Sequence, residues 1–265
     1  MLERGRLNER HGVCEHCGHH HPLGLSQRIA SLFDPRSYAP RDDVLRSADP
    51  LGFGDGEYAQ AYRSLGREAM VYGTASVDGA PCVAVLMDFS VFGGSLGVVV
   101  GEIFCRACEL SLDQRLPLLA VISSGGARMQ EGTPALLQMA KVMMALRGLE
   151  EEGRGYAALL CDPTCGGVTA SFATAADVIL AEPGALICFS GPRVVEQTTG
   201  VRPRPDFSRA ESLFRHGLVD LVVPRDGQRQ VLGGLLRFLA GEASGKEDKA
   251  SFIIRNSEPD VERRR

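Results

Sequence analysis

From about residue 67 onward, short apolar runs alternate with longer segments of helical character. The first run, residues 67–90, reads as two strands joined at Asp78-Gly79, a dipeptide typical of a two-residue hairpin turn. Two further strand-like runs occupy residues 117–123 and 156–162, and a helix is expected between them from about Thr133 to Glu152. This alternation predicts an α/β domain in which helices pack on a sheet.

Size and charge exclude several classes of protein. The chain has 265 residues, of which 44% are hydrophobic, so it can bury a core of one large domain. A net charge of -4 argues against a general nucleic-acid-binding protein, and no apolar run is long enough to span a membrane. The N-terminus lacks the apolar core of a signal peptide. We therefore expect a cytoplasmic protein whose eight cysteines are mostly free thiols.

Three glycine pairs lie between strand-like and helix-like segments. Gly125 and Gly126 follow the apolar run PLLAVI, Gly166 and Gly167 follow another, and Gly93 and Gly94 form the third pair. Helix N-termini present unpaired backbone N–H groups, and glycine lets a substrate oxygen approach them closely. A single pair is usually only a tight turn, but three pairs indicate a ligand site. An enolate oxygen is the atom we expect to accept hydrogen bonds there. The chain contains neither a P-loop nor a dinucleotide-binding fingerprint.

Cysteine spacing raises the question of a metal. Cys14 and Cys17 form a CxxC motif with several histidines nearby, which is half of a zinc ribbon. The second half, expected 15 to 20 residues away, is missing. A second CxxC, Cys105 and Cys108, is interpreted as part of the buried stripe of a helix. Cys14 and Cys17 are thus the candidate metal ligands, with further ligands still to be found.

Two interpretations concern the segment after the first glycine pair. Arg128 and Glu131 are expected to order the loop by pairing with each other. In the following helix, apolar residues recur at i, i+3 and i+4 spacing, which predicts one buried face. That face comprises Leu136, Met139, Ala140, Met143 and Leu146.

Several long strings resemble the beta subunit of bacterial acetyl-CoA carboxylase carboxyltransferase. They are DFSVFGGSLGVVVGE, SSGGARMQEG, DPTCGGVTASFA, AEPGALICFSGPRVVEQT and SRAESLFRHGLVDLVV. The resemblance implies a crotonase-type fold of repeated ββα units behind a small zinc-ribbon-like segment. We expect a partial knuckle over residues 1–24, a carboxyltransferase domain over 25–240 and a charged, disordered tail over 241–265.

The resemblance also implies a reaction and partners. The beta subunit would bind acetyl-CoA and an alpha subunit would hold carboxybiotin, in an α2β2 assembly served by biotin carboxyl carrier protein and biotin carboxylase. Within it, we assign the amides of Gly125 and Gly126 to the enolate. Gly93, Gly94, Arg128, Gly166 and Gly167 are assigned to acyl-CoA binding.

The chain departs from the family pattern in ways that leave alternatives open. Its start coincides with the linker between two expected CxxC knuckles, so zinc remains in question, and Arg67 and Thr74 replace common lysines. These differences favour, as a rival, a carboxyltransferase of a specialised pathway. The beta subunit of a malonate decarboxylase and a non-catalytic regulator or nucleic-acid-binding protein are further alternatives. Acetyl and propionyl groups both remain open as the acyl group.

Overall fold

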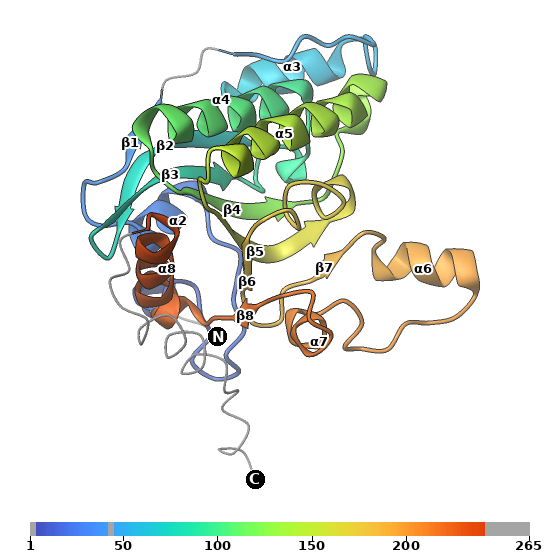
Figure 1. The fold of residues 1–265 in the computed structure, drawn as a ribbon. Helices are drawn as coiled ribbons and strands as arrows, with labels where there is room; N and C mark the ends of the chain where they lie inside the picture. Colours follow the sequence, from blue (N-terminus) through green and yellow to red (C-terminus); the bar gives the residue numbers. More distant parts are fainter. Residues whose placement is uncertain (1–3, 42–44, 242–265) are drawn as a thin grey trace.

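One mixed sheet organises the molecule in the computed structural model, which describes residues 4–41 and 45–241 (Figure 1). Its strand order is β1-β2-β3-β4-β5-β6-β8, and β7 pairs with β5. The first three strands are antiparallel neighbours, and all later pairings are parallel. The strands are β1 Ala39–Pro40, β2 Met70–Val77, β3 Ala80–Met87, β4 Leu118–Ser124, β5 Tyr156–Cys165, β6 Val178–Ala181, β7 Ile187–Cys188 and β8 Leu221–Val222.

The predicted hairpin is confirmed. Strands β2 and β3 pair in register from Met70 with Met87 to Val77 with Ala80. Asp78 and Gly79 both have positive φ angles, 49° and 77°, as a type I′ turn requires. Helix α4 follows directly, so this part of the chain forms one ββα unit, in agreement with the expected fold class.

Helices cover both faces of the sheet (Figure 1). Side chains of β3 alternate between two cores: Val83 and Val85 face the core under α4 and α5, whereas Ala84 and Leu86 face the core under α2 and α8. The apolar runs are therefore buried on both sides. The helices are α1 Arg4–Glu9, α2 Leu25–Leu32, α3 Glu57–Leu65, α4 Val98–Gln114, α5 Thr133–Glu151, α6 Pro192–Thr199, α7 Ala210–Arg215 and α8 Arg225–Leu239, with 3-10 turns η1 Phe92–Gly94, η2 Met129–Glu131 and η3 Gly166–Val168.

The predicted face of α5 is right at Leu146, which is buried, and at Met139, which packs against the core, but wrong at the other three positions. The helix occupies the expected range, but Leu136, Ala140 and Met143 are exposed. The face that packs against the core is offset by about one position along the sequence. Helix α5 therefore contacts α4 through a different set of residues from the predicted one. Its buried residues are Ala135, Gln138, Val142, Leu146 and Leu149.

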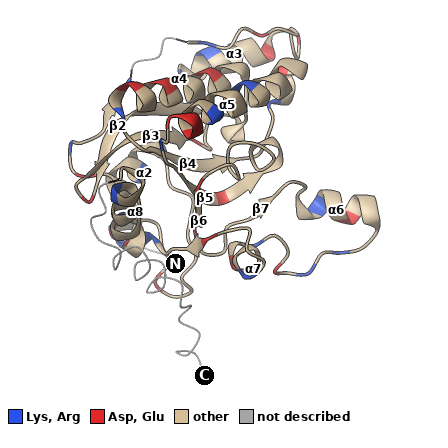
Figure 2. Ribbon diagram, in the orientation of Figure 1, with Lys and Arg blue, Asp and Glu red and all other residues tan. Residues whose placement is uncertain are grey.

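Charged residues lie mainly on the helices and loops (Figure 2). Both signs occur along α4 and α5, whereas β3 and β4 carry none. The first two turns of α5, residues 133–140, also carry no charge. This end of α5 exposes two large apolar side chains, Leu136 and Leu137.

Of the remaining expectations, some are tested by the structure and others are not. Cys105 and Cys108 are buried in α4, which confirms their interpretation as core residues. The predicted domain boundaries stay a prediction, and the tail lies outside the described residues from residue 242 onward. No helix within residues 4–41 and 45–241 is long and apolar enough to cross a bilayer.

Glu182 joins helices α2 and α8 to the sheet. It follows β6 and is fully buried, and Arg225 contacts both of its oxygens, with Nε at 2.8 Å and Nη2 at 2.7 Å. Arg28 of α2 donates to the same carboxylate at 2.5 Å. Burial alone would raise the pKa of Glu182, but the hydrogen bonds and charges of Arg225 and Arg28 lower it to about 2. The carboxylate therefore remains ionised and joins α2, β6 and α8.

Stability is expected to depend on this carboxylate at acid pH. Because its folded pKa lies below the ordinary 4.5, its contribution is present above pH 4.5 and is lost as pH falls toward about 2. Thermal unfolding followed across that interval measures it. The stability difference between the wild type and Glu182→Gln should shrink on acidification; a difference that stays constant would contradict the assignment.

Candidate active site

The three glycine pairs meet at the carboxyl ends of neighbouring strands. Gly125 and Gly126 follow β4, and Gly166 and Gly167 follow β5, its parallel neighbour. A methyl group built on Gly126 would lie 3.2 Å from the carbonyl oxygen of Cys165 and 3.3 Å from the nitrogen of Gly167. The two turns thus touch through their backbones, and side chains there would separate them.

The third pair joins the first through the backbone. Gly125 donates its N–H to the carbonyl of Gly93 at 2.9 Å, and Leu96 donates to the carbonyl of Gly126 at 2.8 Å. Ser124 adds a bridge, since its hydroxyl donates to the carbonyl of Gly94 at 2.7 Å. All three pairs were candidate site residues, and the structure brings all three together.

The amide groups chosen from sequence are already engaged. The N–H of Gly125 is used by Gly93, and the N–H of Gly126 donates to the Ser124 hydroxyl at 3.0 Å. Helix α5 begins only at Thr133, so neither amide lies at a helix N-terminus. Both facts argue against the assignment of these two N–H groups as donors to an enolate oxygen.

The neighbouring amides of Ala127 and Gly167 are better candidates for donors to an enolate oxygen. Among the described residues, no hydrogen-bond acceptor is found for the N–H groups of Ala127 and Gly167. The nitrogen of Ala127 is 3.7 Å from the position that a Cβ on Gly167 would occupy. Both residues are half-buried. An oxygen atom entering between the turns therefore finds two unused backbone donors.

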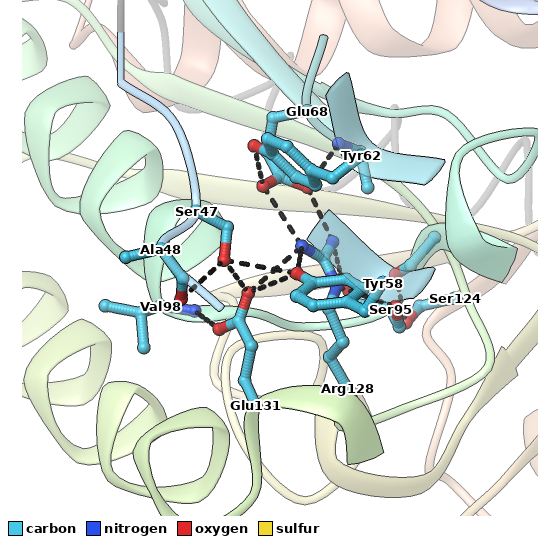
Figure 3. Close-up of polar contacts among 12 residues, drawn as sticks. Ser47, Ala48, Tyr58, Tyr62, Glu68, Ser95, Val98, Ser124, Arg128 and Glu131 are labelled. Atoms are coloured by element: carbon cyan, nitrogen blue, oxygen red, sulfur yellow. Dashed lines mark hydrogen bonds and ion pairs between the residues drawn. The ribbon is translucent and has the colours of Figure 1, made fainter. Parts of the chain in front are cut away.

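Arg128 lies among polar side chains from several parts of the chain, including Glu68, Tyr58 and Glu131 (Figure 3). Its side chain is 0% exposed, so direct contact with an acyl-CoA would require the loop to rearrange. Its guanidinium donates to both oxygens of Glu68, at 2.5 and 3.1 Å. It also donates to the hydroxyl and the carbonyl of Ser95, at 3.0 and 2.8 Å. Burial alone would lower the pKa of Arg128, but the hydrogen bonds and charge of Glu68 raise it, so the group stays charged.

The expected pairing of Arg128 with Glu131 is confirmed, and it is buried rather than on the surface. Nη1 of Arg128 lies 3.4 Å from Oε1 of Glu131. The other oxygen of Glu131 accepts the N–H of Val98 at 2.6 Å, at the first turn of α4. Tyr58 donates to Glu131 at 2.7 Å, and Ser47 also contacts this carboxylate (Figure 3). The pair thus fixes the glycine loop to α4 and to α3.

Several members of this buried network were missed in the sequence analysis. Tyr58 and Tyr62 come from a segment without a clear strand or helix pattern, and Glu68 lies at the start of the run predicted as the hairpin. Tyr62 donates to Glu68 at 2.7 Å. Their partners lie far away in sequence, so periodicity carries no signal of them. The one local clue was the i, i+3 spacing of Arg128 and Glu131.

The described residues do not complete a zinc site. Cys14 is buried, Cys17 is exposed and both are free thiols. Throughout residues 4–41 and 45–241, no group of three or more His, Cys, Asp or Glu side chains converges as metal ligands would. His20 is buried nearby, but neither of its ring nitrogens has a partner. These residues do not fit the zinc ribbon expected from the resemblance.

A family model named carboxyl transferase domain matches residues 23–226. The match includes all three glycine turns and the residues of the Arg128 network. It begins after Cys14 and Cys17.

Similar curated proteins are of two kinds, separate beta subunits and longer proteins named subunits beta/alpha. The acetyl-coenzyme A carboxylase carboxyl transferase subunit beta of Synechococcus sp. (strain CC9311) is 49% identical over 243 residues, which cover 89% of this chain and 83% of that protein. The subunits beta/alpha protein of Salinispora arenicola (strain CNS-205) is 48% identical over 253 residues, covering 93% of this chain. The chain spans only 44% of this longer relative.

Solved structures agree on the fold. The transcarboxylase 12S, in a structure with hydrolysed methylmalonyl-coenzyme A bound, has a TM-score of 0.71 and 25% identity. The match covers 89% of this chain and 43% of that chain. A Pseudomonas malonate decarboxylase hetero-dimer has a TM-score of 0.63 and 25% identity, covering 88% and 93% of the two chains.

Proposed function

The chain belongs to the carboxyl transferase family, and we propose that it is the acyl-CoA-binding beta subunit of a biotin-dependent acetyl-CoA carboxyltransferase. In this role it accepts acetyl-CoA and, together with an alpha subunit, produces malonyl-CoA. The 49% identity to a carboxyl transferase beta subunit supports the proposal, since it extends over most of both proteins. We also propose a cytoplasmic location, as expected from the sequence.

One observation carries the chemical part of the proposal: two unused amides, those of Ala127 and Gly167, lie close together where the glycine turns touch. We assign the N–H groups of Ala127 and Gly167 to the thioester oxygen of the acyl-CoA. That oxygen gains negative charge as the α-proton leaves, and fixed donors stabilise it without reorganisation. Each such donor contributes about 3 to 4 kcal/mol in comparable sites.

The other glycines bring the turns together. Gly126 and Gly166 permit the close approach of the two turns, and Gly93 and Gly94 lie beside Gly125, where we place the pantetheine. Carboxybiotin on a carrier protein would supply both the carboxyl group and, after its release, a ureido nitrogen as base. No side-chain base is then required of this chain. We assign the binding of carboxybiotin to the alpha subunit, and leave the acyl group open between acetyl and propionyl.

Helix α5 offers a surface for the alpha subunit. Leu137 is 66% exposed and Met144 is 77% exposed, and the uncharged first turns of the helix continue toward Met129 beside the glycine loop. Exposed large apolar side chains gathered on one helix face favour an interaction site, and Lys141 lies between Leu137 and Met144 on this face. We propose that this face packs against the alpha subunit next to the glycine turns.

Leu137→Glu combined with Met144→Glu is expected to weaken association with the alpha subunit at least about tenfold, because two carboxylates would be buried at the contact. Analytical ultracentrifugation of the mixed subunits measures the affinity. Leu218→Glu is the matched control, since Leu218 is similarly exposed, at 61%, but lies in the loop before β8. Equal affinity of the double variant and the wild type would place the contact elsewhere.

The proposed function is tested by carboxyl transfer in the reverse direction, from malonyl-CoA to free biotin. Transfer that requires both this chain and a candidate alpha subunit supports it. Decarboxylation of a malonyl thioester on an acyl-carrier protein, without transfer to biotin, would overturn it in favour of a malonate decarboxylase. A preference for a different acyl-CoA in the same assay would identify the specialised-pathway alternative.

A further inference from the structure

Two cysteines meet at the edge of the proposed site. Cys165 ends β5 and Cys188 ends β7, and the two residues are direct partners in the parallel pairing of these strands. Their sulphur atoms are 3.0 Å apart, and both are free thiols. Partners in adjacent strands have their Cα atoms within the range that a disulfide can bridge. The bond could therefore form after only a small movement.

Cys188 is buried, yet its pKa differs in direction from that of the neighbouring core cysteine Cys161. The hydrogen bond between Cys188 and Cys165 lowers the pKa of Cys188, and the charge of Arg209 adds to this effect. Burial raises the pKa of Cys161, on the same strand β5, to about 12. Cys165 is half-buried rather than enclosed. The same hydrogen bond and burial raise the pKa of Cys165, so the thiolate forms first at Cys188. Since the thiolate is the reactive form, an oxidant should select Cys188 over Cys161.

We propose that Cys165 and Cys188 are a redox-modification site at which hydrogen peroxide forms a reversible intramolecular disulfide. The Cys188 thiolate attacks one peroxide oxygen, which gives a sulfenic acid and, after protonation of the leaving hydroxide, one water. The Cys165 sulphur then attacks the sulfenic sulphur, its proton leaves with the hydroxyl group, and a second water forms. Two thiols are oxidised by two electrons and one peroxide is reduced. A dithiol such as dithiothreitol reverses the bond by thiol–disulfide exchange.

The bond would act on the glycine turns because of where Cys165 lies. Its carbonyl oxygen is the atom closest to a Cβ built on Gly126, and Gly166 is the next residue in the chain. Drawing Cys165 toward β7 moves the Gly166–Gly167 turn relative to Ala127. Misplacement of reacting groups by ~1 Å can cost on the order of 100-fold in rate. Formation of the bond stands by itself, whereas its effect on carboxyl transfer rests on the proposed function.

The experiment treats the full chain with hydrogen peroxide and maps the products by mass spectrometry before and after dithiothreitol. The expected product is a cross-linked pair of peptides containing Cys165 and Cys188, lighter by two hydrogen atoms and separated again by dithiothreitol. Cys165→Ser and Cys188→Ser should each abolish the cross-link, whereas Cys17→Ser, which removes an exposed thiol outside the pair, should retain it. Independent oxidation of the two cysteines, without the link, would overturn the proposal.

The same samples are assayed for carboxyl transfer with the alpha subunit. Peroxide should slow the wild type and Cys17→Ser at least about tenfold, with recovery in dithiothreitol, and neither pair variant should show this reversible loss. Full activity of the cross-linked chain would overturn the effect on the turns. Absence of transfer from untreated chain would instead count against the proposed function, while the mapped disulfide would still stand.

Discussion

Gly126→Ala is expected to reduce carboxyl transfer by about 100-fold or more. Gly126 has a φ of +108°, a conformation that an alanine rarely adopts. Its new methyl group would also lie 3.2 Å from the Cys165 carbonyl oxygen and 3.3 Å from the Gly167 nitrogen, so the two turns would have to separate. Loss of one oxyanion donor alone costs on the order of 100- to 1,000-fold in rate.

The measurement is the reverse transfer assay, with thermal unfolding to show that the variant still folds. Gly148→Ala is the matched control, because Gly148 lies in α5 with no atom within 4 Å of the added methyl. It should retain wild-type transfer. Wild-type transfer by Gly126→Ala would show that the contact between the turns is unimportant for the reaction.

Arg128→Met is expected to lower the free energy of unfolding by about 3 to 5 kcal/mol. The substitution removes a cation that contacts both Glu68 and Glu131, and the two buried carboxylates would be left without it. Removing one partner of a buried ion pair has costs of this size because the remaining charge is desolvated and unpaired. Urea unfolding of the isolated chain measures the loss.

Arg147→Met provides the matched control on the surface. Arg147 also pairs with a carboxylate, Glu151, at 2.9 Å, but its side chain is 75% exposed. An exposed pair contributes little, so the expected change stays within about 0.5 kcal/mol. Similar losses in the two variants would contradict the claim that burial gives the Arg128 network its effect.

Local sequence patterns were sufficient for much of the fold and for the location of the site. The Asp78-Gly79 turn fixed the hairpin, because only a few dipeptides accept two positive φ angles. The apolar runs predicted strands that proved to be buried on both faces. The three glycine pairs also converge, since parallel neighbouring strands end at the same edge of the sheet.

Other features depended on contacts that no local pattern contains. The Glu68 partner of Arg128 lies 60 residues earlier in the chain, so its pairing could not be inferred from spacing. The offset of the buried face of α5 reflects how α4 and α5 pack, and apolar residues occur on both faces of the helix. The choice of amides also required coordinates, because only they show that Gly93 and Ser124 already occupy the donors of Gly125 and Gly126.

The most direct test of the proposed site is an experimental structure of this chain, assembled with its alpha subunit, with an acyl-CoA bound. The account predicts a thioester oxygen within hydrogen-bond distance of the backbone nitrogens of both Ala127 and Gly167, with Arg128 still buried against Glu68. A thioester bound away from these two amides would contradict it.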